Sequence, residues 1–463
     1  MINKSEMKQV LLEALKTGAT FAELYFEDTH NIGIKVVKDT VENVDNGVLH
    51  GCALRLLKGV EETYGYTNDV SLEGLLTLAR KLNKFYKGQQ TVFDFEFKDL
   101  SNKNNVNISK LTYLEPLKVK TDYLKQATKG ALEFDKSIIQ AMGTGYEHVQ
   151  NITVCNSNGV YNTDIRNNIR FSVSVVCENE NGKQEASKNY GGNFGLDAYK
   201  DFDFYNMGRE AAKQALTMLN APQVKGGVYD VVIHNAFGGV IFHEACGHGL
   251  EASSVSRGLS VFAGKLGQKI ASDVVTAIDD GTINNEWGSL NCDDEGTPTK
   301  KNVLIENGIL KSYMVDYKNS LIMNTNVTGN SRRQSYKYIP TSRMTNTYIA
   351  NGTSSFEEII SNTKNGIFAK ELGGGSVNPS TGEFNFSVNE GYLIEDGKIT
   401  TPVRGATLIG KGQEVLLNID MVSNNQTFGY GMCGSSSGSI PACVGQPTIR
   451  VKGMTVGGNG GNN

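Results

Sequence analysis

The sequence predicts an α+β protein of two domains, and three observations lead to this prediction. In residues 1–221, segments with the apolar spacing of helices are mixed with segments in which apolar and polar residues alternate as in strands. Residues 222–457 consist mainly of strand-like segments and glycine-rich turns. Pro222 follows the last long helical pattern and places the domain boundary there. Residues 458–463 contain only glycine and asparagine, and we expect this tail to be disordered.

The N-terminal domain, residues 1–221, is predicted to begin with an amphipathic helix and not with a secretion signal. Its apolar residues recur at i, i+3, i+4, i+7 and i+8, namely at Met7, Val10, Leu11, Ala14 and Leu15. Residues 24–59 alternate in strand fashion, with turn signals at 31–33 and 45–47. Helices are then predicted at residues 71–82, with Ser71 as N-cap, near 120–135, and at 204–221. A surface connection (84–110) and a strand pair (151–186) account for the rest.

The C-terminal domain, residues 222–457, opens with a strand at 228–234. Asn235 is a candidate N-cap for a helix over residues 236–250. Two later segments, VLIENGIL (303–310) and YLIEDGKI (392–399), are predicted hairpins. Their Asn-Gly and Asp-Gly pairs supply the positive φ angles that a type I′ turn requires.

The composition excludes several classes of function. Lys and Arg total 45 and Asp and Glu total 49, so there is no net positive charge to favour nucleic acid. No run of about 18 apolar residues is present, so we expect no membrane-spanning helix. The seven cysteines are odd in number and form no C-x-x-C pair, which favours a reducing, cytoplasmic location.

The segment IFHEACGHGLEA (241–252) carries the clearest chemical signal. His243 is followed by Glu244, and His248 lies five positions after His243, one more than the metalloprotease motif H-E-x-x-H allows. On a regular α-helix these two imidazoles would point about 140° apart. A π-bulge or an equivalent break would turn both to one face, and Gly247 and Gly249 make such a distortion easy. The spacing therefore predicts a metal site on a distorted helix.

The third metal ligand is open from the residues alone. A catalytic zinc site usually has three protein ligands and one open position for water. Glu251 is the local candidate, and Cys433, between glycines in GYGMCG, is the distant one. Cys246 is close in sequence, but we expect it to point away from the histidines. Glu244, beside a ligand, suits the role of general base for an attacking water.

Other segments have both a functional and a structural interpretation. Gly373–Ser376 lacks the lysine of a phosphate loop and is better explained as a strand edge, where a peptide could add as an extra strand. CDDEGTP (292–298) is predicted to be a solvated turn and not a cation site. His234 is interpreted as a hydrogen-bonded core histidine, with a supporting role at the metal as the alternative. A last group could bind a substrate carboxylate or could simply pack: Arg332, Arg333, Arg343, Tyr336 and Tyr338.

Over about residues 10–457 the sequence resembles the TldD/PmbA family of metallopeptidases, and within it the TldD branch. The resemblance rests on HEACGH (243–248), DDEGTPTKKNVLIENGILKSYMVD (293–316), TGNSRRQSYKYIPTSRMTNTYI (328–349), GGGSVNPSTGEFNFSVNEGYLIEDGKI and GYGMCG…VGQPTIRVKGMTVGG. It implies an N-terminal mixed α/β domain and a C-terminal, largely antiparallel β domain that carries the metal-binding helix. It also implies that His243, His248 and Cys433 bind zinc and that Glu244 is the catalytic base.

The function implied by this resemblance is zinc-dependent hydrolysis of short or unfolded peptides by a zinc-activated water. One zinc per chain is expected, and the substrate-binding residues are not identified. Family members form homodimers or heterodimers with a related TldE/PmbA-type subunit that lacks the zinc motif. Two alternatives are a non-catalytic binding protein of the gyrase-modulator type with a structural metal, and a zinc hydrolase acting on a non-peptide amide.

Overall fold

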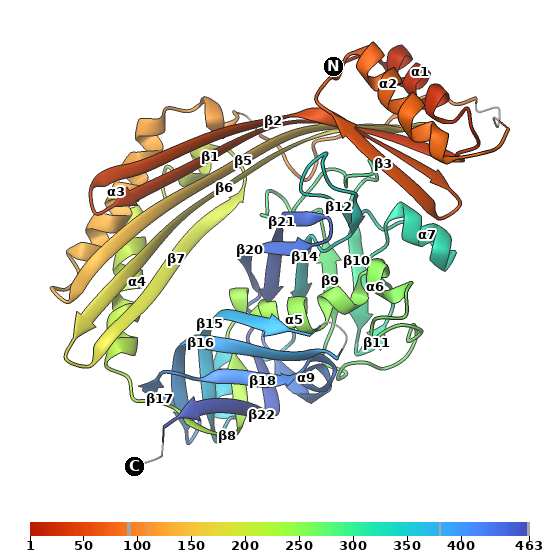
Figure 1. Ribbon diagram of the computed structural model, residues 1–463. Coiled ribbons are helices and arrows are strands. Elements are labelled where there is room, and N and C mark those ends of the chain that lie inside the picture. The colour runs from red at the N-terminus through yellow and green to blue at the C-terminus, as the bar shows by residue number, and fades with distance from the viewer. Residues whose placement is uncertain (90–93, 109, 379–380, 461–463) are drawn as a thin grey trace.

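The computed structural model describes residues 1–89, 94–108, 110–378 and 381–460. In its N-terminal half a long curved sheet arches over the C-terminal half (Figure 1). The strand order in this sheet is β3-β2-β1-β5-β6-β4, and β7 also pairs with β6. Its strands are β1 (Phe21–Val37), β2 (Thr40–Lys58), β3 (Glu61–Thr67), β4 (Lys98–Asp99), β5 (Ile138–Asn156), β6 (Val160–Asn179) and β7 (Gly182–Asn193).

Among the described residues, four α-helices cover the two ends of this sheet (Figure 1). They are α1 (Lys4–Ala14), α2 (Leu72–Leu82), α3 (Leu117–Leu132) and α4 (Phe204–Leu219). Helices α1 and α2 share a hydrophobic core with β1 and β2, whereas α3 and α4 pack against β1, β5 and β6. The five apolar residues predicted for the first helix are all buried, and Ser71 caps α2 by accepting from the Gly74 N–H. These local predictions are confirmed.

The two turns predicted at residues 31–33 and 45–47 are wrong. Strands β1 and β2 run through both segments, which lie opposite each other with Asn31 paired to Gly47 and Gly33 paired to Asp45. The reversal is instead at Lys38, whose φ is 56°. A long ladder with a second neighbour, β5, on the other side of β1 outweighs the local preference of these residues for turns.

The C-terminal half contains two larger sheets. One has the order β11-β10-β9-β14-β21-β20, and the other has the order β15-β8-β22-β18-β16-β17 with an additional β15–β16 pairing that closes a ring. The pairs β14–β21 and β8–β15 are parallel, and the other named pairs in this half are antiparallel.

The strands of this half are β8 (Lys225–Ile233), β9 (Ala277–Asp280), β10 (Lys301–Glu306), β11 (Ile309–Leu310), β12 (Ser331–Arg332), β13 (Thr341–Ser342), β14 (Asn346–Ile349), β15 (Asn365–Val377), β16 (Glu383–Glu395), β17 (Lys398–Val403), β18 (Thr407–Lys411), β19 (Ile419–Val422), β20 (Thr427–Ser435), β21 (Gly438–Gln446) and β22 (Ile449–Asn459). Its helices are α5 (Val240–Ala245), α6 (Ala252–Val255), α7 (Tyr317–Met323), α8 (Phe356–Ser361) and α9 (Gly412–Asn418).

Both predicted hairpins are present. Asn307 and Gly308 connect β10 and β11 with φ angles of 46° and 81°. Asp396 and Gly397 connect β16 and β17 with φ angles of 49° and 73°. These are the positive angles of a type I′ turn.

The chain passes from one half to the other between α4 and β8. Within the described ranges, every named strand pair lies either in residues 21–193 or in 225–459, and we propose residues 221 and 222 as the domain boundary. Strand β22 continues to Asn459, and the Gly460 N–H donates to the Val224 carbonyl at 2.7 Å, so the start of the expected tail is ordered. Residues 461–463 lie outside the described residues. In the described part of the chain, no helix is long and apolar enough to cross a membrane.

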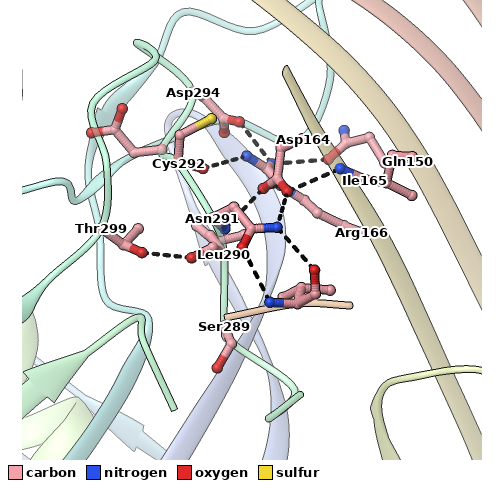
Figure 2. A network of polar contacts seen from close by, with 12 residues as sticks. Gln150, Asp164, Ile165, Arg166, Ser289, Leu290, Asn291, Cys292, Asp294 and Thr299 are labelled. Carbon is pink, nitrogen blue, oxygen red and sulfur yellow. Dashed lines mark hydrogen bonds and ion pairs between the residues drawn. The ribbon is translucent and has the colours of Figure 1, made fainter. Parts of the chain in front are cut away.

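Residues 292–296 of the CDDEGTP segment are buried, which corrects its interpretation as a solvated turn, and Pro298 is exposed. Asp293 accepts hydrogen bonds from three main-chain N–H groups, those of Glu295, Thr297 and Ser331. Asp294 forms an ion pair with Arg166 of β6 at 2.7 Å (Figure 2), and Glu295 pairs with Arg55 of β2. Asp294 and Glu295 thus join the C-terminal half to the long sheet, since each of these two charges meets an arginine of that sheet.

Candidate metal centre

The segment that carries HEACGH is helical but broken. Helix α5 ends at Ala245, Cys246 has φ −130° and ψ −46°, and a 3₁₀ turn follows over Gly247–Leu250. This break confirms the predicted distortion of the helix. The distortion is an interruption of the helix and not a π-bulge. Asn235 occupies the predicted N-cap position, before the 3₁₀ turn Ala236–Gly239, but its side chain makes no capping hydrogen bond and donates to the Asn425 carbonyl instead.

Close backbone contacts hold this broken helix in place. At Gly239, just before α5, a Cβ would lie 2.6 Å from the main chain of Gly445 in β21. At Gly412, the first residue of α9, a Cβ would lie 2.3 Å from the carbonyl oxygen of Ala245. Glycine is needed at both positions, and it lets β21 and α9 approach the helix directly.

The break brings three of the candidate ligands together. His243 Nε2 lies 3.3 Å and His248 Nε2 lies 3.4 Å from the Sγ atom of Cys433 on β20. The ligand atoms of the three residues all lie within 4.8 Å of one another. His243 and Cys433 are buried, and His248 is partly exposed.

The charges of this cluster favour a thiolate. Burial alone would raise the pKa of Cys433, but the charge of His243 and the hydrogen bonds to both imidazoles outweigh it and lower the pKa to about 3. Burial likewise opposes the charged form of His248, but Glu251 and Cys433 raise its pKa well above the usual value. Cys433 is therefore held as the anionic form that binds metals.

The two glutamates near the cluster take different positions. Glu244 Oε2 lies 3.7 Å from His248 Nε2, and the Glu244 side chain is 32% exposed. Glu251 Oε2 lies 3.2 Å from the other nitrogen of His248, Nδ1, and its side chain is 5% exposed. Glu251 thus orients the imidazole through Nδ1. Glu244 lies beside Nε2, the nitrogen that faces Cys433, and can reach solvent. Cys246 is outside the cluster, and burial raises the pKa of its thiol.

Arg343 supports the cluster in a way that sequence reasoning missed. The side chain is fully buried and donates to the Cys433 carbonyl oxygen, to Ser437 Oγ at 2.9 Å and to the Gly438 carbonyl at 3.0 Å. Its Nε lies 3.9 Å from Glu251 Oε1. These contacts fix the β20–β21 hairpin relative to the broken helix, and they leave the guanidinium buried away from any substrate.

The donor set fits a zinc ion. Zinc binds imidazole nitrogen at about 2.0–2.1 Å and thiolate sulfur at about 2.3 Å, usually in a tetrahedron. Two such donors on one ion are about 3.5 Å apart, close to the N–S distances of 3.3 and 3.4 Å seen here. Two imidazoles and a thiolate also leave one tetrahedral position for water, as in catalytic zinc sites.

His234 has a structural environment. Its Nδ1 lies 3.0 Å from Thr448 Oγ1, and its ring lies against Phe356 and Phe368. Burial, with a smaller effect from Lys370, lowers its pKa to about 4. The interpretation of His234 as a hydrogen-bonded histidine with a structural role is confirmed, although the side chain is partly exposed and not fully within the core.

Acid should destabilise the protein through this histidine. In the unfolded chain His234 titrates near 6.5, whereas in the folded state its pKa is about 4. Between these values the unfolded state binds more protons, so the stability that His234 contributes above pH 6.5 is lost as the pH falls toward 4. We expect His234→Gln to lose less stability than the wild type between pH 7 and pH 5, measured by urea unfolding. Equal losses in the two proteins would contradict this assignment.

Comparison with known proteins agrees with this fold and site. The sequence matches PmbA/TldA metallopeptidase domain 1 over residues 22–83, the central domain over 115–219 and the C-terminal domain over 226–458. The Metalloprotease TldD homolog of Buchnera aphidicola from Acyrthosiphon pisum is 37% identical over 476 residues, which cover 99% of this chain and 96% of that protein. The Metalloprotease TldD homolog of Haemophilus influenzae is 37% identical over 456 residues, 95% and 93% of the two chains.

Solved structures show the same fold. TldE from Thermococcus kodakarensis has a TM-score of 0.76 at 21% identity, covering 97% of this chain and 99% of that one. A Thermotoga maritima protein proposed to modulate a DNA gyrase has a TM-score of 0.79 at 19% identity, covering 98% and 100%.

The matching domains define a metallopeptidase, and the fold and the cluster of two histidines and a cysteine agree with that class. The chain belongs to the PmbA/TldA metallopeptidase family, and its TldD relatives are named metalloproteases, a name that implies a metal.

Proposed function

We propose that this protein is a zinc-dependent peptidase that binds one zinc ion per chain through His243, His248 and Cys433. The observation that carries the proposal is the convergence of two imidazole nitrogens and a thiolate, all within 4.8 Å, from helix α5, the 3₁₀ turn that follows it and strand β20. The name of one relative, the Zinc metalloprotease TldD homolog of Saccharolobus solfataricus, which is 33% identical over 56% of this chain, supports zinc as the metal.

Glu244 is the proposed general base. Zinc held by this cluster would lower the pKa of a water molecule and polarise the substrate carbonyl. Glu244 lies beside His248 Nε2 and is partly exposed, so its carboxylate can take a proton from the attacking water and pass it to the leaving amine. Glu251 orients His248 and Arg343 fixes Cys433, so the residues around Glu244 are held in position.

A cleft of about 380 Å³ is the proposed binding site for the peptide. It is lined by residues of β7, β15 and β20, including Lys188, Gly373, Gly374 and Tyr430. Strand β8 pairs with β15 only over residues 366–369, so beyond that point this edge of β15 is not paired by β8. An extended peptide could add to this edge through its own backbone, which gives affinity with little choice of side chain.

Unfolded chains should therefore be cleaved and compact domains spared. In a folded domain the backbone groups needed for strand addition are already paired, so the scissile bond cannot reach the metal. We expect the purified protein to cleave a destabilised, unfolded variant of a small domain at least about tenfold faster than the folded parent. Each 1.4 kcal/mol needed to free the backbone of the folded parent lowers its cleavage rate about tenfold. The cleavage rates are measured by mass spectrometry of the fragments. Equal rates for the folded and unfolded forms would contradict strand addition.

The partner is proposed to be a second copy of this chain or a TldE/PmbA-type subunit. The similarity in fold to TldE over 97% of this chain supports a shared architecture of the two kinds of subunit. Because this chain carries the HEACGH motif, it would supply the metal centre of either assembly.

A further inference from the structure

A second polar site lies between the long sheet and the β20–β21 hairpin. It is a cavity of about 140 Å³ with a buried floor and an exposed rim. Gln150, Arg166, Asn168, Arg332 and Arg333 form the floor, and each is only 2–3% exposed. Gln334, Met432 and Ser439 lie at the exposed rim. All lining residues belong to the described part of the chain, and no aspartate or glutamate is among them.

Two of the three arginines in the floor already have carboxylate partners. Arg166 pairs with Asp294 at 2.7 Å and with Asp164 at 3.3 Å, as Figure 2 shows. Arg333 pairs with Glu23 at 2.7 Å. The positive charges of these two side chains are therefore compensated inside the protein.

Arg332 is different, because it bonds only to main-chain oxygens. Its Nη1 donates to the carbonyls of Met344 and Pro441, at 3.1 and 2.7 Å. No carboxylate among the described residues lies within ion-pair distance of Arg332, and its buried Nε has no hydrogen-bond partner. Nη2 likewise makes no hydrogen bond within that part of the chain. Nε and Nη2 form the edge of a guanidinium that binds a carboxylate through two parallel hydrogen bonds.

A buried cation without a counter-ion is unfavourable. Burial, with a contribution from Arg166, lowers the pKa of Arg332 to about 10. The more distant charges of Asp294 and Asp279 oppose this shift only in part, and Arg332 is still charged at neutral pH. An anion in the cavity would relieve this cost, and the neighbouring amides of Gln150 and Asn168 make its surroundings polar. The volume is enough for a ligand the size of acetate or a small amino acid, since a cavity of about 150 Å³ holds benzene.

We propose that this cavity binds a small monovalent carboxylate, held by the free edge of Arg332. Met432 lines the cavity, and Cys433, the next residue on β20, belongs to the metal cluster. Successive side chains on a strand point to opposite faces, so the bound carboxylate lies on the other face of β20 from the metal centre. Arg332 also donates a hydrogen bond to the carbonyl of Pro441, which pairs with Met432. A carboxylate on Arg332 would therefore contact a side chain that binds β21 beside the strand carrying Cys433.

Acetate and acetamide, which share a shape and differ in charge, test this site. Binding to the full-length protein is measured by ligand-observed NMR and by the shift of the melting temperature. We expect acetate to bind and acetamide not to bind, and Arg332→Met to weaken acetate binding roughly 10- to 100-fold, as loss of a charged hydrogen-bonded pair does. Arg257→Met, which removes an exposed arginine elsewhere, should bind acetate like the wild type.

A second variant guards against a folding defect in Arg332→Met. Leu49 lines the cavity from β2, and Leu49→Trp should fill the space while leaving the arginines in place, again with loss of acetate binding. Triglycine with a free or an amidated C-terminus then separates the two sources of a carboxylate, a free small molecule and a chain end. Equal binding of acetate and acetamide, or acetate binding that survives both Arg332→Met and Leu49→Trp, would overturn the proposal.

Discussion

Replacing Glu244 by glutamine is expected to abolish peptide hydrolysis while leaving the zinc in place. Glutamine keeps the size of the side chain but cannot accept the proton of the attacking water, and loss of a general base costs roughly 10²- to 10⁴-fold in rate. The metal should remain because Glu244 is not among the three clustered ligands. The measurement is kcat/KM on a disordered peptide together with zinc content, with Glu357→Gln, a change at an exposed glutamate on α8, as the matched control.

The same experiment separates the alternative functions. Undiminished cleavage by Glu244→Gln would contradict the proposed mechanism. A wild type that retains zinc but cleaves no peptide would instead favour the binding-protein alternative with a structural metal. If the wild type hydrolyses a non-peptide amide and Glu244→Gln does not, Glu244 is still the general base, but the substrate is not a peptide.

Replacing Cys433 should remove the zinc. A thiolate is one of only three protein ligands in the proposed site, so Cys433→Ala is expected to lower zinc affinity by several orders of magnitude and to abolish activity. Glu251→Ala should retain zinc with an affinity reduced roughly 10- to 100-fold, because Glu251 only orients His248. Cys443→Ala, at a buried cysteine on the adjacent strand β21, should keep its full zinc content and serves as the control. If Cys433→Ala kept its full zinc content and Glu251→Ala lost its zinc, Glu251 would be the third ligand in place of Cys433.

The parts of the fold that depend on local pattern could be predicted from the sequence. Helix α1 follows from its apolar spacing, the cap of α2 from Ser71, and the two type I′ hairpins from Asn-Gly and Asp-Gly. The turns expected at 31–33 and 45–47 were wrong because pairing along β1 and β2, invisible in a local window, outweighs local preference. The way in which the long sheet arches over the C-terminal half could likewise not be predicted from local sequence patterns.

The candidate site divides in the same way. The break between His243 and His248 follows from a five-residue spacing flanked by glycines, so local reasoning was sufficient. The role of Arg343 depends on Cys433, which lies 90 residues away, and the burial of Asp294 depends on Arg166, 128 residues away. The sequence predicts CDDEGTP to be exposed and leaves Arg343 open between substrate binding and packing, because the partners of these residues are distant in sequence and become visible only in the folded protein.

Anomalous X-ray diffraction at the zinc absorption edge, on crystals of protein purified without chelators, tests the central claim most directly. We predict one peak per chain within bonding distance of His243 Nε2, His248 Nε2 and Cys433 Sγ, with Glu244 beside it and outside the ligand set. The absence of a peak at this cluster, or a peak bound without Cys433, would contradict the account.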